Sequence, residues 1–354
     1  MRRSMTVYHN SKTPIQSFAV PIVSILTASH QCGRYIGTMI DSVMAQSQSD
    51  WELIIVDDGS TDGTNEVVAP YLLDRRVQFV YQSNMGQAIA RNRAYSLSTG
   101  AYIAVLDADD YWAPDKLKLQ VELMERDPGL GLIYTGGTVV DEQGAASPIP
   151  YQARDICVRP LERLLFEMNP VIFSSVLIRR KFVGPGSFED ERIRCSDDVL
   201  PLLRVAARSG RFGYIPERLT FYRVHSSSRT FVEGVDCYRE GRKRTVDIFF
   251  SEENVPRAIL KHKRRAYALA YYASAVRYNK FRVSAWKAFA NLGLAMVNDP
   301  RMTPKLIRQA VRAAYLFSMP RGVQARIDSF RRKTNVNPDE KVVAAGFPPA
   351  NGRR

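Results

Sequence analysis

The sequence predicts an α/β fold in which a predominantly parallel central sheet carries helices on both faces and is followed by a helical C-terminal region. In the first third of the chain, short runs of β-branched and aliphatic residues alternate with segments of helical period, and strands that alternate with helices form parallel sheets. From about residue 238 onward the pattern is helical throughout. With 354 residues, 45% of them hydrophobic, the chain is long enough to bury a full-sized core.

The first elements follow one another in a regular order. Runs rich in Val, Ile and Leu predict strands at residues 22–27, 53–56, 77–81 and 102–106. The segments between them have helical period, which predicts helices at residues 35–45, 63–71 and 86–97. Ligands of such a sheet bind at the carboxyl ends of its strands, so the residues that follow each strand are the first candidates for a site.

The order becomes mixed after residue 106. Pro114 fits the first turn of a helix that runs to about residue 126, and another helix is expected at residues 198–209. Further strands are expected at residues 130–134, 171–178, 212–215 and 219–224. In the helical region, breaks are expected near residues 256, 281, 300 and 320.

These elements divide the chain into a sheet-containing domain, residues 20–230, and a basic helical region, residues 231–333. Residues 1–19 and 334–354 are polar or rich in Pro, Gly and Ala, and we expect them to be disordered outside the core. The longest apolar stretch, residues 266–276, is shorter than the roughly 20 residues that span a bilayer. No apolar signal-peptide segment follows the basic N-terminus, so we expect a cytoplasmic protein.

The four cysteines are expected to be reduced thiols. They are far apart and show no CxxC spacing, which argues against a metal site or a redox pair. Reduced thiols are also what a cytoplasmic location predicts. The residues are Cys32, Cys157, Cys195 and Cys237.

The net charge of +14 is concentrated in the helical region. Residues 256–333 contain eighteen Lys and Arg against two acids, a local net charge of +16, which leaves about −2 for the rest of the chain. A helix that starts at Thr303-Pro304 places Lys305, Arg308 and Arg312 on one face and Ile307, Ala310, Val311 and Ala314 on another. Such a helix suits peripheral contact with an anionic membrane, although the charged outer face of a helix packed on the core is an equal alternative.

Three acidic motifs are candidates for chemistry. Asp107, Asp109 and Asp110 follow a buried strand, and three close carboxylates repel one another unless a cation or hydrogen-bond donors compensate. Carboxylate oxygens suit Mg²⁺ or Mn²⁺, which also bind substrate phosphates, but a solvated acidic turn is an alternative. Asp57-Asp58 ends a neighbouring strand, so both clusters should line one crevice. Asp197-Asp198 precedes an amphipathic helix, where a carboxylate is either a helix cap or a general base.

Together these motifs resemble family 2 glycosyltransferases of the GT-A fold, over about residues 21–226. The resemblance rests on their order along the chain as much as on any one of them. The motifs are Val23-Ser24-Ile25-Leu26, residues 51–62, Asn84-Met85-Gly86 with Ala90-Arg91-Asn92, residues 102–110 with Pro114-Asp115-Lys116-Leu117, Val183-Gly184 with Phe188, Asp197-Asp198 with Arg204, and residues 222–225.

The resemblance implies an inverting transferase that moves a sugar from a nucleotide-diphosphate donor, by preference a UDP-sugar, to an acceptor hydroxyl in polysaccharide or glycolipid synthesis. It implies Mn²⁺ or Mg²⁺ as cofactor, with Asp109 and His225 as metal ligands, and Asp198 as the catalytic base. Contacts with the nucleotide sugar are implied for Ala28, His30, Asp58, Asp107 and Ala108.

The chain departs from the family pattern at two places. His30-Gln31 stands where a Tyr-Asn or similar pair usually contacts the base, and Asp197-Asp198 replaces a Glu-Asp pair. The first departure leaves the identity of the base open, because His and Gln can also stack or hydrogen-bond. The second leaves the expected base in place.

Other functional classes explain less of the sequence. A haloacid-dehalogenase-type phosphatase wants Thr or Val where Tyr111 stands, and a dinucleotide-binding dehydrogenase wants a GxGxxG turn that residues 28–33 lack. A non-enzymatic binder of anionic surfaces would explain the basic region but would leave the acidic crevice unused. We expect no nucleic-acid partner, because clustered carboxylates repel phosphates unless a metal intervenes.

Overall fold

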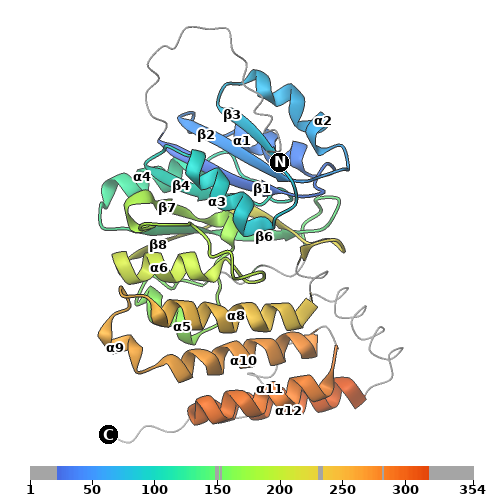
Figure 1. Cartoon of the computed structure of the whole chain (residues 1–354), viewed down its shortest axis with the longest axis vertical. Coiled ribbons are helices and arrows are strands. Elements are labelled where there is room, and N and C mark those ends of the chain that lie inside the picture. Colours follow the sequence, from blue (N-terminus) through green and yellow to red (C-terminus); the bar gives the residue numbers. More distant parts are fainter. Residues whose placement is uncertain (1–21, 148–150, 152–153, 230–233, 281–282, 319–354) are drawn as a thin grey trace, which may run out of the picture.

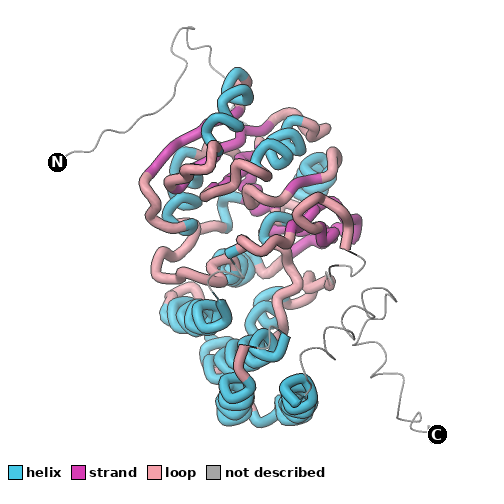
Figure 2. The backbone as a smooth tube through the Cα atoms, turned by 90° about the vertical axis from the view of Figure 1, so that its right-hand side faces the viewer, coloured by secondary structure: helices cyan, strands magenta, loops and turns pink. Residues whose placement is uncertain are grey.

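The computed structural model describes residues 22–147, 151, 154–229, 234–280 and 283–318. The segments expected to be disordered, 1–19 and 334–354, lie outside the described residues. A sheet with flanking helices forms one end of the molecule, and a stack of helices forms the other (Figures 1 and 2). The predicted succession of a sheet-containing part and a helical part is therefore visible in the arrangement of the chain.

The described residues form one eight-stranded sheet with the order β3-β2-β1-β4-β7-β6-β8-β5. Strands β1 to β4 are parallel, and β6 and β8 are also parallel, whereas β7 and β5 pair antiparallel with their neighbours. The predicted α/β class is confirmed, with a mixed sheet. The strands are β1 (Val23–Ser29), β2 (Trp51–Asp58), β3 (Val77–Gln82), β4 (Tyr102–Val105), β5 (Tyr111–Trp112), β6 (Leu132–Val140), β7 (Leu177–Arg179) and β8 (Phe212–Arg223).

Both faces of the sheet are covered, as the sequence predicts. The central strands β1 and β2 read as nearly continuous apolar runs because alternate side chains enter two different cores. Helices α1 (Ile36–Met44) and α4 (Lys116–Arg126) contribute to the core on one face. Helices α3 (Gln87–Leu97) and α6 (Val199–Ser209) contribute to the core on the other face. The crossover after β2 is made by α2 (Thr64–Val68) and the 3-10 turn η1 (Ala69–Leu73).

Two expectations in the second half of the sheet were wrong in detail, and two short elements were missed. Residues 212–215 and 219–224 were expected as two strands, but they belong to one continuous strand, β8. The pairing of β8 with β6 shifts register at Gly136 and Gly137, which accommodates the residues between the two expected strands. Most of the strand expected at 171–178 is the 3-10 turn η2 (Phe173–Ser175), which leaves only β7 as strand. The short elements β5 and α5 (Pro160–Phe166) were not predicted, because their periodicity is too brief to detect.

The helical region is a stack in which α6 contacts α8, α8 contacts α10, and α10 contacts both α11 and α12 (Figure 1). Breaks expected near 256 and 300 fall at Pro256 and Pro300, while those near 281 and 320 fall on residues that are not described. No helix in the described part of the chain is long and apolar enough to cross a membrane. The remaining elements are α8 (Gly234–Ser251), α9 (Arg257–Leu260), α10 (Lys263–Lys280), α11 (Ala285–Asn298), α12 (Thr303–Ser318), η3 (Arg180–Phe182) and η4 (Pro300–Met302).

One pair of cysteines corrects the expectation of four reduced thiols. Cys195 and Cys237 form a disulfide, whereas Cys32 and Cys157 are free. The partners are 42 residues apart in sequence, so only the packing of α8 against the segment before α6 brings them together. Because such bonds persist mainly in oxidising compartments, cysteine usage no longer supports the expected cytoplasmic location.

The apolar side chains of α12 lie on two sides of the helix. Leu306, Ala310 and Ala313 are buried or packed against neighbouring helices. Ile307 and Val311, from the face predicted to be apolar, are 60% and 66% exposed.

Candidate active site

The predicted site residues lie at the carboxyl ends of parallel strands and in segments packed beside them. Asp58 ends β2, the segment of Asp107 to Asp110 lies between β4 and β5, and His225 follows β8. Asp197 and Asp198 come directly before α6. The topology thus brings distant residues together, as the contact between Asp109 and His225, 116 positions apart, demonstrates.

Asp109 faces His225. The carboxylate oxygen Oδ2 lies 2.9 Å from the imidazole Nε2, and the other ring nitrogen lies 2.8 Å from the Ser227 hydroxyl. The His225 side chain is 7% exposed and Asp109 is 25% exposed, so the pair is largely shielded but still open to a ligand. The ring of Tyr35 lies 4.8 Å from the imidazole and limits its movement. One carboxylate and one neutral imidazole are suitable ligands for Mn²⁺ and, through oxygen, for Mg²⁺.

These two ligands do not by themselves complete a metal centre. The described residues contain no group of three or more His, Cys, Asp or Glu side chains placed to hold one ion. Metal ions of this kind retain waters and take substrate phosphates as ligands. The donor set fits an ion that is held jointly by the protein and a diphosphate.

Asp110 has a different role from Asp109. Its side chain is buried and accepts hydrogen bonds from the Ser174 hydroxyl and, at 2.8 Å, from the Arg223 backbone N–H. Burial, together with the charges of Asp109 and Asp107, raises the pKa of Asp110 well above its usual value. Both carboxylate oxygens are occupied, so Asp110 fixes the turn to η2 and β8.

Asp107 belongs to a buried charge network. Its carboxylate lies 2.6 Å from the Arg91 guanidinium, which also pairs with Glu189. Arg91 and Glu189 are both buried, and burial raises the pKa of Glu189 to about 8 although Arg91 opposes the shift. Burial likewise raises the pKa of Asp107, again against the effect of Arg91. One guanidinium therefore orients two carboxylates at this end of the sheet.

Asp58 anchors the start of α3. Its carboxylate accepts hydrogen bonds from the backbone N–H groups of Met85 and Gly86 and from the Gln82 amide, all at 2.8 Å. Asp57 accepts hydrogen bonds from the backbone N–H and the hydroxyl of Ser60, so it stabilises the turn after β2. Asp58 thus connects β2 with the turn before α3, and its contact with a nucleotide stays a prediction.

The other residues predicted to contact the nucleotide lie around the ends of β1 and β4. His30 is exposed, with Nε2 3.3 Å from the Asn84 amide. Ala28 is partly buried at the end of β1, and Ala108 is 3% exposed between Asp107 and Asp109. These positions are compatible with the predicted contacts but do not test them.

Asp198 occupies the N-cap position of α6 but makes no capping hydrogen bond. Its nearest polar partner is the Asn169 amide at 3.5 Å from Oδ2. Burial and the adjacent Asp197 raise the pKa of Asp198, while nearby arginines lower it. The capping alternative is therefore not supported by the geometry, and the carboxylate is available to accept a proton.

Asp197 has a separate partner. Arg229 lies 2.6 Å from its Oδ1 and also donates to the Gln87 side chain. Besides burial, Arg91 and Asp109, the charge of Asp197 raises the pKa of Asp107 and the charge of Arg229 lowers it. Asp197 therefore interacts electrostatically with the segment that follows β4. The two acidic motifs therefore belong to one electrostatic site.

Several residues of this site were not predicted individually. Arg91 was only one letter of a motif, and Glu189, Ser174, Asn169 and Arg229 gave no local signal. They lie in loops or irregular turns whose position depends on the fold, with Arg91 as the exception in α3. A buried arginine could have been suspected only from its motif.

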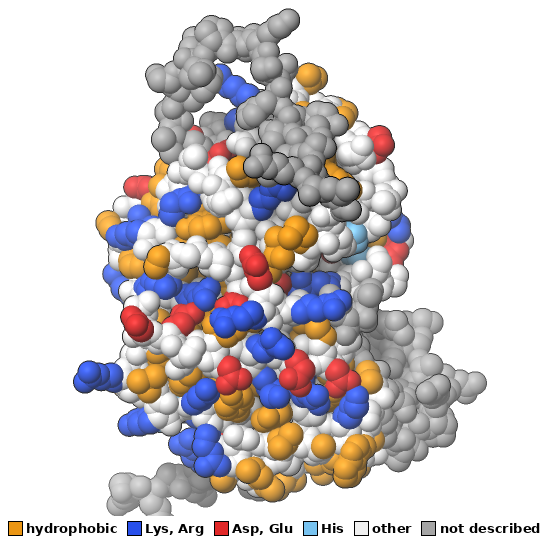
Figure 3. Space-filling view, viewed as in Figure 1, with side chains coloured by type: hydrophobic (Ala, Val, Ile, Leu, Met, Phe, Trp, Pro, Cys, Tyr) orange, Lys and Arg blue, Asp and Glu red, His pale blue; other side chains and the backbone are white. Residues whose placement is uncertain are grey.

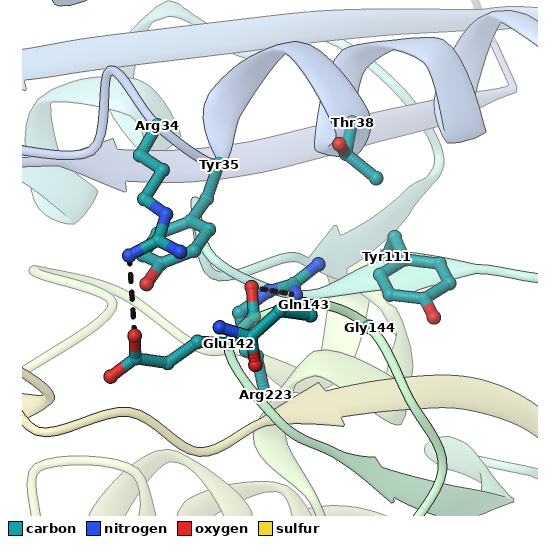
Figure 4. A pocket seen from close by; sticks show the side chains of 8 residues that line it. All are labelled: Arg34, Tyr35, Thr38, Tyr111, Glu142, Gln143, Gly144 and Arg223. Atoms are coloured by element: carbon teal, nitrogen blue, oxygen red, sulfur yellow. Dashed lines mark hydrogen bonds and ion pairs between the residues drawn. The ribbon is translucent and has the colours of Figure 1, made fainter.

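A pocket of about 350 Å³ opens beside this site but contains none of the predicted site residues (Figure 4). It is lined by Arg34, Tyr35, Thr38, Tyr111, Glu142, Gln143, Gly144 and Arg223. Nε of Arg223 donates a hydrogen bond of 2.8 Å to the backbone carbonyl of Asp109. Arg34 forms an ion pair with Glu142 at 3.2 Å. Its cationic side chains are thus already engaged by protein oxygens.

Comparisons with known proteins identify the family and the fold. The family model described as Glycosyl transferase family 2 matches residues 24–184. The chain is 43% identical over 130 residues to the Bacillus subtilis (strain 168) protein assigned as the teichuronic acid biosynthesis glycosyltransferase TuaG, a match that covers 34% of this chain and 52% of that protein. It is 30% identical over 218 residues to the protein of the same strain assigned as glycosyltransferase EpsE, covering 60% of this chain and 75% of that protein.

A similar fold is found in the S. aureus fragment TarS 1-349, with a TM-score of 0.59 at 15% identity, over 83% of this chain and 88% of that fragment. The same fragment is known in complex with UDP. The chain spans about half the length of TuaG, so the match there concerns only part of that protein.

Proposed function

Because the chain belongs to glycosyl transferase family 2, we propose that it transfers a sugar from a nucleotide-diphosphate donor to an acceptor hydroxyl, with inversion at the anomeric carbon. A UDP-sugar is the proposed donor, and cell-surface polysaccharide or glycolipid synthesis is the proposed setting. The proposal is supported by the Asp109–His225 contact, by the missing capping hydrogen bond at Asp198, and by Asp197 and Arg229, whose charges act on both Asp107 and Asp198.

On the donor side, Asp109 and His225 are proposed to hold Mn²⁺ or Mg²⁺. When bound, the ion would offset negative charge that develops on the departing diphosphate. Asp107, oriented by Arg91, is proposed to face the ribose, and Asp58 and His30 to contact the base or ribose. Ala28 and Ala108, at the ends of β1 and β4, are also proposed to contact the nucleotide sugar.

On the acceptor side, Asp198 is proposed as the general base. The acceptor oxygen forms a bond to the anomeric carbon, the bond from that carbon to the diphosphate oxygen breaks, and the diphosphate leaves with the bonding electron pair. Asp198 takes the proton that the acceptor hydroxyl loses. Attack from the face opposite the leaving group gives inversion.

A screen of nucleotide sugars tests the donor half of this proposal. The protein is incubated with UDP-, GDP- and dTDP-sugars, with and without Mn²⁺, and hydrolysis or thermal stabilisation is measured. We expect one UDP-sugar to be hydrolysed slowly in a metal-dependent manner. If no nucleotide sugar is bound or hydrolysed under any of these conditions, the proposed activity is wrong.

We also propose that the helical region attaches the protein to an anionic membrane surface, at the cytoplasmic face if the protein resides there. Hydrophobic side chains gather over α11 and α12 at the end of the molecule away from the sheet (Figure 3). Exposed apolar residues there lie beside exposed Lys305 and Arg308, which favour anionic lipid. The apolar residues are Trp286, Val297, Ile307 and Val311.

Flotation with vesicles tests this attachment. Vesicles that contain about 30% anionic lipid should recover more protein than neutral vesicles, because each nearby basic residue adds about 1 kcal/mol of attraction. Trp286→Ser should reduce this recovery, whereas Leu73→Ser, which removes an exposed apolar side chain at the far end of the molecule, should not. Equal recovery with anionic and neutral vesicles would contradict the proposal.

A further inference from the structure

Two arginines of the helical region have no acidic partner among the described residues, although one of them is nearly buried. Arg242 in α8 is 7% exposed, and neither Arg242 nor Arg277 in α10 makes a hydrogen bond or ion pair with any part of the described chain. Arg277 lies over the ring of Tyr238, with its guanidinium carbon 3.7 Å from the ring centre. No nitrogen of Arg242 or Arg277 is among the fully buried atoms without a partner in the described residues, so both guanidinium groups are accessible to a ligand that supplies an anion.

The packing of α8 places these arginines beside Asp198. The disulfide between Cys195 and Cys237 ties the first turns of α8 to the segment that leads into Asp197 and Asp198. One helical turn later, Gly241 packs so closely on this segment that a Cβ atom there would lie 1.8 Å from the Cys195 carbonyl oxygen. Tyr238 and Arg242 directly follow these two contact positions and share one face of the helix.

The electrostatics agree with this placement. The charges of Arg242, Arg229 and Arg277 oppose the rise in the pKa of Asp198 that burial and Asp197 cause. For Asp107, by contrast, the cations that oppose the rise in pKa are Arg91 and Arg229. Arg242 and Arg277 therefore act on the side of the site that holds the proposed base, away from the residues proposed to hold the nucleotide.

Aromatic side chains complete this part of the site. Burial and the charge of Asp198 raise the pKa of Tyr151, and Arg277 opposes this rise. Its ring meets the ring of Tyr222 edge-on, with centroids 6.5 Å apart. Burial and the charges of Asp110, Asp109 and Asp107 raise the pKa of Tyr222. Aromatic faces bind the apolar faces of sugar rings, and guanidinium groups bind carboxylate or phosphate oxygens in pairs.

We propose that Arg242 and Arg277 form an anion-binding subsite for the acceptor, so that the acceptor carries a carboxylate or phosphate group near the hydroxyl that is glycosylated. This proposal rests on the proposed function, because it takes Asp198 as the base at the acceptor hydroxyl. The subsite makes the helical region part of acceptor recognition. It also explains why α8 is fastened to the segment before α6, since a shift of α8 would move the arginines away from Asp198.

Matched acceptor probes test the subsite. Binding of three p-nitrophenyl glucoside forms, neutral, 6-phosphorylated and oxidised to the glucuronide, is measured to protein saturated with UDP and Mn²⁺. The wild type should bind at least one anionic form about tenfold more tightly than the neutral form, as expected for charge-assisted hydrogen bonds. Whichever anionic form binds more tightly shows whether the subsite prefers a phosphate or a carboxylate.

Substitutions then assign this preference to the arginines. Arg242→Gln and Arg277→Gln should each reduce it several-fold, and the double variant should abolish it. Lys243→Gln is the matched control, because it removes a cation of the same helix that is paired with Glu240. Thermal melting checks folding, and Arg277→Gln, at a less buried position, keeps the test valid if Arg242→Gln does not fold.

The outcomes separate this inference from the proposed function. Metal-dependent hydrolysis of the donor by water should be unchanged in Lys243→Gln, and its absence from the wild type would count against the proposed function alone. The subsite is overturned if the wild type shows no preference for either anionic form, or if the preference survives in the double variant. A raised KM for the donor with an unchanged acceptor preference would assign the arginines to the donor and also overturn it.

Discussion

Asp198→Asn separates the proposed catalytic role of this residue from any structural role. Asparagine has the same shape and keeps an acceptor oxygen for the Asn169 amide, which is only a 3.5 Å contact. No helix-capping hydrogen bond is lost, because Asp198 makes none. The substitution therefore removes little except the ability to accept a proton.

The expected effects on stability and activity have different signs. The pKa of Asp198 is raised in the folded protein, so ionisation at neutral pH costs stability that a neutral amide does not. Asp198→Asn should therefore melt at the same temperature as the wild type or slightly higher. Loss of a general base typically lowers the rate about 10²- to 10⁴-fold, equivalent to about 2.7–5.4 kcal/mol in activation free energy.

The assay compares turnover, donor affinity and melting temperature in one series. Once the donor and acceptor are identified, kcat should fall by the stated factor while the Kd for the donor stays within about twofold. Asp115→Asn is the control, because Asp115 is also an N-cap aspartate without a capping bond, at α4. Turnover of Asp198→Asn within tenfold of the wild type would refute the reasoning, as would an equal loss in Asp115→Asn.

Three further predictions concern metal binding, pH and packing. His225→Asn should weaken the Mn²⁺-dependent gain in UDP affinity about 10-fold or more in calorimetry, and unchanged coupling would remove His225 from the metal site. Activity should fall as the pH drops through the pKa of Asp198, so the acidic limb of kcat/KM should lie above the ordinary aspartate value of 3.8; a limb at or below that value would contradict the raised pKa. In chemical denaturation, Gly241→Ala should lower the free energy of unfolding by about 1–3 kcal/mol, because its Cβ would meet the Cys195 carbonyl. Gly293→Ala, with open space around its added Cβ in α11, should raise it by about 0.5–1 kcal/mol, and equal effects of the two changes would argue against the tight contact.

The candidate site was predictable in composition but not in the roles of its members. The acidic residues after β2 and β4 and before α6 were found from sequence, because they follow or precede segments of clear periodicity. The partner of each carboxylate was not predictable. Asp109 meets His225, Asp107 meets Arg91, and Asp110 is held by Ser174, and these partners are 16 to 116 residues away.

The helical region shows the same limit. Its helices and the breaks at Pro256 and Pro300 follow from local pattern. Its contribution beside Asp198 does not, because it depends on the disulfide between Cys195 and Cys237 and on the close approach of α8. The orientation of α12 was likewise decided by packing against α11 and not by the periodicity of its own residues.

The sequence by itself determined the α/β class, the succession of a sheet-containing part and a basic helical part, and the family to which the chain belongs. These conclusions depend on the hydrophobic periodicity of each segment and on the order of the motifs, and both can be recognised from residues that are close together in sequence. Only the tertiary structure decided which of three chemically identical aspartates faces His225, which of them is buried, and which arginines act electrostatically on Asp198. The physical reason is that burial and charge partners set the chemistry of a carboxylate, and both come from residues that are distant in sequence.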